Sequence, residues 1–306
     1  MALLLVGVII VVSVAVGVAV ELHFGERADR ACGRILNLLL YVVVPPVIFF
    51  NIVHLDFTLD VGVGLLIGLL ASVLTGVLAF SVGRARGWPR PVIGTVIISS
   101  VAGNTAYLGY PFAAIAFGSD ALPEAVAYDS LVAIPVLVVG CFAVGAAFGE
   151  SSGETLGGRV SSFFFRNPVL PAFVLALLAP DWLAPDLAVT LSQVLVFAML
   201  PVGFVAVGVY LAESSAGRFS IPHPDLRIGT AVVLKLLALP GLLALIALPL
   251  IAIPEVYLVQ AAMPSGLNTL IVANAYGLDR RLAAGAIVWS TGAVLLVAGA
   301  VAALSA

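Results

Sequence analysis

Residues 35–55 read ILNLLLYVVVPPVIFFNIVHL, an apolar run that contains two adjacent prolines and a single histidine near its end. About 20 apolar residues cross roughly 30 Å of hydrocarbon as a helix, so this stretch alone predicts a membrane span. Hydrophobic residues make up 62% of all 306 positions and charged residues only 9%, a composition too apolar for a water-soluble protein. We therefore expect a polytopic helical membrane protein.

The same pattern recurs along the whole chain. The ten predicted spans cover residues 2–21, 35–53, 61–83, 91–117, 123–148, 163–180, 187–211, 228–250, 254–276 and 282–304. The first is interpreted as a span and not as a secretory signal, because no positively charged segment precedes it. The sixth is the least regular, since it contains Pro168 and Pro171. The predicted fold class is all-α integral membrane.

Basic residues predict the orientation of these spans, because short loops rich in Lys and Arg stay on the cytoplasmic side. Twelve of the thirteen basic residues follow odd-numbered spans: Arg27, Arg30, Arg34, Arg84, Arg86, Arg90, Arg159, Arg166, Arg218, Arg227, Arg280 and Arg281. The loops after even-numbered spans carry acids instead: Asp56, Asp60, Asp120, Asp181, Asp186 and Glu255. Omitting the sixth span would destroy this alternation. We expect ten spans in the cell membrane with both termini on the extracytoplasmic side.

Two later segments are similar to earlier ones, which indicates an internal repeat. Residues 191–211, LSQVLVFAMLPVGFVAVGVYL, align with residues 35–55, and AYGLD at 275–279 aligns with AFGSD at 116–120. Each pair is five predicted spans apart, and because five is odd the second copy is inverted. Inverted repeats are typical of secondary transporters, although a duplication that only enlarged a helical bundle would leave the same pattern.

The fourth and ninth predicted spans contain helix-breaking residues at corresponding places. Residues 99–111 read SSVAGNTAYLGYP and residues 263–269 read MPSGLNT. Proline lacks a backbone donor and clashes with the preceding turn, and glycine tolerates opened geometry. A break at membrane depth requires that the freed backbone groups face protein or a wet cavity. We predict that both helices break and cross near the midplane at a substrate site, with these helix-break residues: Gly109, Pro111, Pro264 and Gly266.

Polar side chains beside the two breaks are the candidate substrate-binding residues: Asn104, Thr105, Tyr107, Ser265, Asn268 and Thr269. Amides, hydroxyls and helix N-termini offer neutral donors to a carboxylate. The alternative is that small polar residues here serve helix packing, which is the favoured interpretation for Ser99 and Ser100. Asn37 and Asn51 are candidates for supporting roles.

Two ionisable residues lie inside predicted spans, where a functional role is the default hypothesis. Asp129 follows Pro123 by six residues, roughly 9 Å along a helix, and is the candidate for proton or cation coupling. Its alternative role is that of a structural acid bonded to neighbouring helices. The favoured interpretation of Lys235 is that its long stem returns the ammonium to the cytoplasmic surface, and the alternative is a counter-charge for an anion.

These stretches together resemble the auxin efflux carrier family of membrane transporters. The resemblance rests on LNLLLYVVVPPVIFF at 36–50, GNTAYLGYP at 103–111, Asn167-Pro168, KLLALP at 235–240 and MPSGLNTLIVANAYG at 263–277. It implies a ten-helix fold of two inverted five-helix repeats whose fourth and ninth helices are broken and cross. It also implies organic anion substrates, auxin in plant relatives and malonate or similar carboxylates in some bacterial ones, and often a homodimer.

Within this resemblance, Asn104 takes the place of the asparagine beside the first break, and Pro111 and Pro264 take the places of the break prolines. Asp129 falls where plant relatives have a glutamine, and Thr269 replaces a proline common in plant members. A carboxylate beside an anionic substrate repels it unless it is protonated or cation-bound, which favours coupled transport. The short loop after the fifth span, without a large regulatory domain, indicates a prokaryotic member.

The sequence therefore predicts a secondary active transporter of a small organic anion, working by alternating access, with no cofactor beyond Na⁺ or H⁺ as coupling ion. Its units are residues 1–148 and 163–306, joined by a cytoplasmic linker at 149–162. The alternative is a channel or membrane receptor built from the same bundle. An intramembrane enzyme has little support, because the three histidines match no hydrolase motif. A net charge of −3 without a basic run argues against a nucleic-acid partner.

Overall fold

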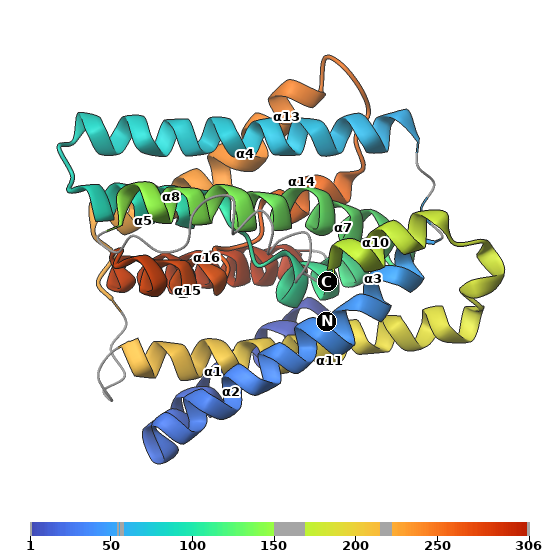
Figure 1. Ribbon diagram of the computed structural model, residues 1–306, viewed down its shortest axis with the longest axis horizontal. Coiled ribbons are helices and arrows are strands. Elements are labelled where there is room, and N and C mark those ends of the chain that lie inside the picture. Colours follow the sequence, from blue (N-terminus) through green and yellow to red (C-terminus); the bar gives the residue numbers. More distant parts are fainter. Residues whose placement is uncertain (1, 54, 56–57, 150–168, 215–221, 305–306) are drawn as a thin grey trace.

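The computed structural model describes residues 2–53, 55, 58–149, 169–214 and 222–304. Apart from one isolated β-bridge, the regular secondary structure in these ranges is helical (Figure 1). Nearly all of the predicted linker at 149–162 lies outside the described residues. The elements up to residue 148 are α1 (Ala2–Phe24), α2 (Glu26–Leu38), η1 (Leu39–Val43), α3 (Val44–Ile52), α4 (Leu59–Ala85), α5 (Arg90–Val101), η2 (Thr105–Gly109), α6 (Tyr110–Phe117), η3 (Ser119–Ala121), α7 (Leu122–Tyr128), η4 (Asp129–Ala133), η5 (Val136–Cys141) and α8 (Phe142–Phe148).

The second part of the chain continues the helical pattern. Its elements are α10 (Val169–Leu178), η6 (Asp181–Leu183), α11 (Asp186–Ser214), α12 (Leu226–Val233), η7 (Leu234–Ala238), α13 (Leu239–Ala247), α14 (Glu255–Ala261), α15 (Asn268–Tyr276) and α16 (Arg280–Leu304). Side chains cap the N-termini of α4 in the first part and α12 in the second. Thr58 accepts from the Val61 amide, and Asp225 accepts from the Ile228 amide. Such caps satisfy donors that have no partner inside the helix.

Within the described residues, six helical segments are long and apolar enough to cross a membrane. They are Gly7–Phe24, Leu59–Ala85, Ser119–Phe148, Asp186–Val209, Leu226–Ala247 and Arg280–Val301. They coincide with the first, third, fifth, seventh, eighth and tenth predicted spans. Shorter apolar helices cover Tyr41–Ile52, Arg90–Val101 and Thr105–Phe117, within the second and fourth predicted spans. The structure thus confirms a helical protein with several candidate spans, while the count of ten and the inverted repeat stay predictions.

Wide helical turns occur directly before several prolines inside the bundle. The π-helical elements η1, η2, η4 and η7 each end two residues before a proline: Pro45, Pro111, Pro135 and Pro240. A proline removes one backbone donor and its ring clashes with the carbonyl four residues earlier, so a locally wider turn relieves the clash without ending the helix. At these four positions proline therefore widens a turn and does not end the helix.

The helices pack in two groups. The α11 group consists of α1, α2, α3, α10 and α11, and the α5 group consists of α4, α5, α7, α8 and α12 to α16. Figure 1 shows α11 with α1 and α2 along one side of the bundle and α4 on the opposite side. Elements η2 and α6 contact α11 and thus lie at the seam between the two groups.

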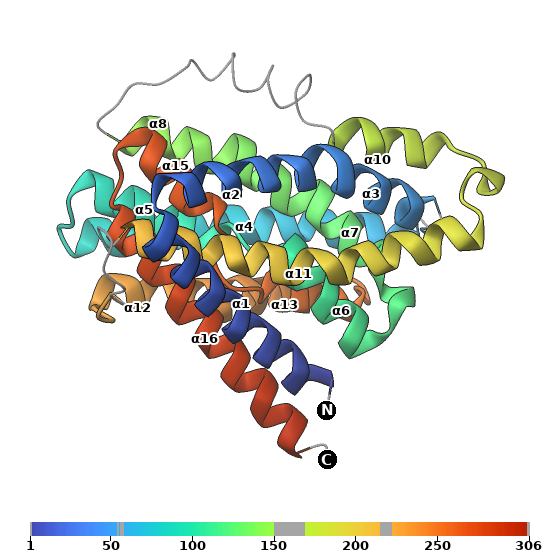
Figure 2. The same cartoon turned by 90° about the horizontal axis from the view of Figure 1, so that it is seen from below.

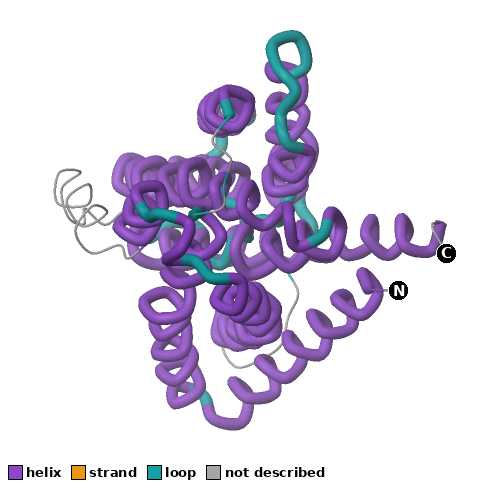
Figure 3. The backbone as a smooth tube through the Cα atoms, turned by 90° about the vertical axis from the view of Figure 1, so that its right-hand side faces the viewer, coloured by secondary structure: helices purple, strands orange, loops and turns teal. Residues whose placement is uncertain are grey.

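Small residues allow α1 and α11 to cross closely. A Cβ on Gly17 would lie 2.0 Å from the Val205 carbonyl oxygen, and a Cβ on Gly208 would lie 2.2 Å from the Val14 carbonyl oxygen. Glycine-mediated approach of this kind is typical of helix pairs in membranes. The outer ends of α1 and α16 lie near each other, so the two chain termini are neighbours (Figures 2 and 3).

Candidate functional site

The fourth predicted span is broken at Ala102 to Asn104. Helix α5 ends at Val101, Ala102 is extended with φ −81° and ψ 118°, and the helix resumes at Thr105. Gly109 and Pro111 lie beyond the break in the resumed helix, so their predicted role as helix-break residues is corrected. Pro111 near the start of α6 is accommodated by the π-helical turn before it and ends no helix.

The ninth predicted span is broken between Ala261, where α14 ends, and Asn268, where α15 begins. Pro264 and Gly266 both lie inside this break, as predicted. Five of the six residues in the interruption are buried, so freed backbone groups there need partners within the protein.

The two breaks supply those partners to each other. Gly103 and Ser265 form an isolated antiparallel bridge, in which the Asn104 amide donates to the Pro264 carbonyl at 2.8 Å and the Gly266 amide donates to the Ala102 carbonyl at 3.1 Å. A Cβ on Gly266 would lie only 2.8 Å from the Gly103 carbonyl oxygen, so glycine is required for this approach. We call this paired region the crossing. Its amides at Asn104 and Gly266 are occupied by backbone acceptors, unlike the free anion-binding amides that the sequence suggested.

Side chains reinforce the crossing. The Ser265 hydroxyl donates to the Ser99 carbonyl at 2.7 Å, and the Ser265 amide donates to the Ser290 hydroxyl of α16 at 3.0 Å. The Thr269 hydroxyl donates to the Gly266 carbonyl at 2.8 Å, closing the first turn of α15. Ser265 and Thr269 thus stabilise the breaks through bonds to the backbone.

The predicted substrate-binding residues divide by position. Asn104, Thr105, Ser265 and Thr269 are buried at or beside the crossing. Asn268, by contrast, is exposed at the first position of α15, so the structure does not bring it together with them. Tyr107 is half-buried and packs against α11, since a Cβ on Gly203 would lie 2.8 Å from the Tyr107 ring. The side chain of Asn37 lies outside the described part of the chain.

Asp129 is buried beside the first break. The hydroxyls of Thr105 and Tyr110 donate to its two carboxyl oxygens, the second at 2.6 Å. Both donors come from the half-helix that begins immediately after the break, so the carboxyl group links η4 to η2 and α6. This geometry agrees with a structural acid bonded to neighbouring helices, and it also places the group where a proton or cation change would reach the crossing.

Lys235 is buried on another side of the crossing, with 1% of its surface exposed. Its ammonium donates to the Ala261 carbonyl at 2.7 Å, at the last residue of α14, and a Cβ on Gly103 would lie 3.2 Å from Nζ. The predicted return of this side chain to the cytoplasmic surface is therefore wrong. The stem instead crosses the bundle interior, because η7 faces the gap opened by the second break.

Sequence reasoning missed two residues of this region. The Tyr110 hydroxyl donates to Asp129. The side-chain amide of Gln260 packs against Gly109, and a Cβ on Gly109 would lie 2.2 Å from Gln260 Oε1. The Gln260 Oε1 atom is buried without a hydrogen-bond partner, while its Nε2 donates weakly to the Ala125 carbonyl at 3.4 Å. The only signal in the sequence was their location: Tyr110 directly precedes Pro111, and Gln260 lies just before the second break.

A family model and two archaeal proteins are similar to this chain. Residues 164–301 match the model of the family described as membrane transport protein. An uncharacterized transporter of Methanothermobacter thermautotrophicus is 24% identical over 270 residues, which cover 87% of this chain and 87% of that protein. An uncharacterized transporter of Methanocaldococcus jannaschii is 25% identical over 291 residues, which cover 90% of each chain.

Proposed function

Because residues 164–301 match the model of the membrane transport protein family and two archaeal transporters are similar to most of the chain, we propose that the protein is a secondary active transporter that moves a small organic anion by alternating access. The cargo in this proposal is a carboxylate of the auxin-like or malonate-like class. The protein works in the cell membrane as ten spans in two inverted five-helix repeats, with both termini extracytoplasmic, and forms a homodimer.

The observation that carries the anion proposal is the buried ammonium of Lys235. It has three donors, and its one acceptor among the described residues is the neutral Ala261 carbonyl. The described residues place no carboxylate within 4.0 Å of it. A buried charge without a counter-charge is unfavourable, and an anionic substrate would supply one. The carboxylate would bind between Lys235 and the polar side chains of the crossing.

Asn104 and Thr105 support this placement because both lie at the start of the half-helix that follows the first break. The Asn104 amide is already bonded to the Pro264 carbonyl, so the Asn104 side chain is the group offered to substrate. The helix dipole favours an anion at the start of this half-helix. These side chains are buried, so solvent has little access to them in this conformation. Alternating access explains how substrate arrives: movement along the seam between the α11 group and the α5 group opens the crossing to one side at a time.

Coupling is assigned in this proposal to Asp129, because its hydroxyl partners lie on the half-helix that would bind substrate. Gaining or losing a proton, or binding Na⁺, changes the acceptor capacity of the carboxyl group and thus the bonds to Thr105 and Tyr110. The coupling ion therefore acts on the site through the position of that half-helix. Similarity to a transporter family favours transport over catalysis.

The proposal is tested by counterflow in liposomes that contain the purified protein and a panel of unlabelled carboxylates. Saturable uptake of labelled malonate or indole-3-acetate, accelerated by internal substrate, is expected. Conductance that does not saturate would instead identify a channel, and binding without flux would identify a receptor.

One variant pair locates the site within the same assay. Asn104→Ala is expected to abolish counterflow while the protein remains folded in detergent. The matched control is Asn274→Ala, whose side chain is exposed on α15 and bonds only Arg280 among the described contacts. Normal counterflow by the Asn104 variant would remove the crossing as the substrate site.

A further inference from the structure

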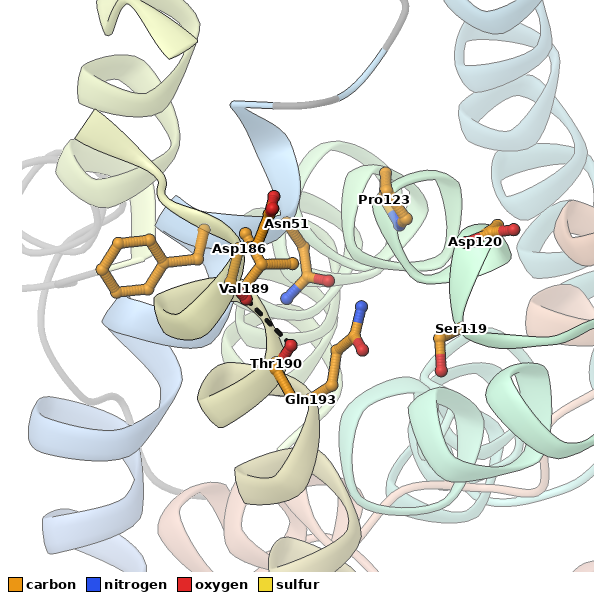
Figure 4. Close-up of a pocket in the computed structure, with 9 residues that line it drawn as sticks. Asn51, Ser119, Asp120, Pro123, Asp186, Val189, Thr190 and Gln193 are labelled. Carbon is orange, nitrogen blue, oxygen red and sulfur yellow. Dashed lines mark hydrogen bonds between the residues drawn. The ribbon is translucent and has the colours of Figure 1, made fainter. Parts of the chain in front are cut away.

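A second site lies away from the crossing, at the seam between the two helix groups. A pocket of about 380 Å³ is lined by Phe50, Asn51, Ser119, Asp120, Pro123, Asp186, Val189, Thr190 and Gln193. Figure 4 shows α3 and α11 forming one wall and the segment around η3 and α7 forming the other. A cavity of this size matches those that hold small organic molecules.

The lining of this pocket is acidic. Asp120 and Asp186 supply two carboxylates, and Ser119, Thr190 and Gln193 add polar groups. No Lys or Arg is found among the described residues that line it, and the loops that carry these two acids contain no basic residue in the sequence. A positively charged ligand is therefore favoured here, and an anion is repelled.

Asn51 provides an acceptor whose orientation is fixed. Its Nδ2 donates to the Val47 carbonyl at 2.7 Å and to the Ser192 hydroxyl at 3.2 Å, and that hydroxyl donates onward to the Val189 carbonyl. Because a carbonyl can only accept, the amide nitrogen must face Val47 and the amide cannot be turned round.

The other end of this amide is unpaired. Asn51 Oδ1 is buried and has no hydrogen-bond partner in the described part of the chain, and the residue is 1% exposed. In Figure 4 the amide oxygen of Asn51 faces the pocket, on the same side as the amide of Gln193. A buried acceptor without a donor is costly, so the pocket is suited to a ligand that brings an N–H group.

We propose that this pocket binds a small organic cation with a primary ammonium group. The ammonium donates to Asn51 Oδ1, while Asp120 and Asp186 balance its charge and Phe50 and Pro123 contact its hydrocarbon part. A multivalent metal ion fits less well, because the described residues contain no cluster of three or more His, Cys, Asp or Glu side chains.

The site is separate from the crossing. Gln193 precedes Gly203, which contacts Tyr107, by ten residues of α11, a rise of about 15 Å. Asn51 and Gln193 belong to the α11 group. Pro123 lies in the first turn of α7, in the α5 group, and Asp120 lies in η3 directly before α7. An occupant therefore contacts both groups at once and ties them together.

The test measures binding to the purified full-length protein, so it is independent of transport. Isothermal titration with putrescine dihydrochloride is compared with tetramethylammonium chloride and sodium chloride at equal ionic strength. Tetramethylammonium carries a positive charge but has no N–H donor. Saturable binding of putrescine alone is expected. The proposal would be overturned if either control salt bound as tightly as putrescine, or if malonate bound and putrescine did not.

Three variants assign the binding to this pocket. Asn51→Leu is expected to weaken putrescine binding at least tenfold, and Asp120→Asn, a change at an exposed side chain that leaves the fold intact, at least threefold. Asp181→Asn removes an exposed acid that does not line the pocket and is expected to change nothing. Putrescine affinity that is the same in the Asp120 and Asp181 variants would refute the site, as would the absence of any putrescine binding.

Discussion

Asp129 and Lys235 are both buried ionisable residues beside the crossing, but their surroundings differ. Both carboxyl oxygens of Asp129 accept hydrogen bonds from hydroxyl groups, so the acid has partners built into the fold. Among the described residues, Lys235 has a single backbone acceptor for its three donors. A satisfied group stabilises one conformation, whereas an unsatisfied one retains capacity for a ligand.

This difference separates two roles that the sequence could not separate. In the proposed mechanism, the Asp129 side holds the half-helix after the first break in place, and the Lys235 side offers charge to whatever enters the crossing. Burial of an ionisable residue therefore does not by itself mark a binding group, because its hydrogen-bond partners decide whether it has capacity left for a ligand. The first three of the following changes each alter one side and leave the other intact, and the last one touches both.

Lys235→Met should have the largest effect. It removes the ammonium and keeps much of the stem, so counterflow of a carboxylate should fall by roughly 100-fold, the equivalent of about 3 kcal/mol for a hydrogen bond to a charged group. Thermal unfolding in detergent should be unchanged or slightly higher, because an apolar chain avoids burying a charge.

The control for that prediction is Arg281→Met, which removes an exposed basic residue at the start of α16. It should retain counterflow. If the Lys235 variant transports normally, Lys235 is not the counter-charge for the substrate, and the different surroundings of Asp129 and Lys235 do not correspond to different roles in transport.

Asp129→Asn should have the next largest effect, and on a different quantity. An amide cannot gain or lose a proton at neutral pH, so uptake should lose its dependence on an imposed pH or Na⁺ gradient while exchange at equilibrium continues at about a tenth of the original rate, a change of about 1.4 kcal/mol. Uptake measured with and without each gradient checks this. Gradient dependence that persists in the variant would leave Asp129 with a structural role alone.

Tyr110→Phe should produce a smaller change, seen mainly in stability. It removes the donor to Asp129 Oδ2 and keeps the ring, so the free energy of unfolding should fall by about 1 kcal/mol, as is usual for interhelical hydrogen bonds in membrane proteins. Denaturation in mixed detergent measures it. Thr105→Val is the paired change on the other oxygen, and a double variant that costs no more than either single change would show that the two hydroxyls do not act independently.

Gly103→Ala should have the smallest effect, since the new methyl group would touch Lys235 Nζ at 3.2 Å and Thr105 Cγ2 at 3.4 Å. The lysine end is flexible and can move by a few tenths of an ångström, so stability should change by less than about 1 kcal/mol. The apparent affinity for larger carboxylates should drop more than that for malonate. By contrast, Gly266→Ala meets a backbone carbonyl at 2.8 Å and should destabilise the crossing measurably.

The sequence alone determined the class of the fold and the approximate places of the breaks. Apolar runs of span length indicated membrane helices because the hydrocarbon layer demands internally bonded backbone over about 30 Å. Pro264 and Gly266 marked the second break correctly, since these residue types weaken a helix wherever they occur. The charge alternation and the repeat predicted ten inverted spans, which stay predictions.

Only the tertiary structure decided what the polar residues contact. Pro111 was expected to break its helix, but a wide turn absorbs it and the break falls at Gly103, where a second backbone approaches. Lys235 was expected at the surface and points inward, while Asn268 was expected at the site and is exposed. Local sequence sets where a helix is weak, but which groups meet depends on residues far apart in the chain, and no local pattern encodes those meetings.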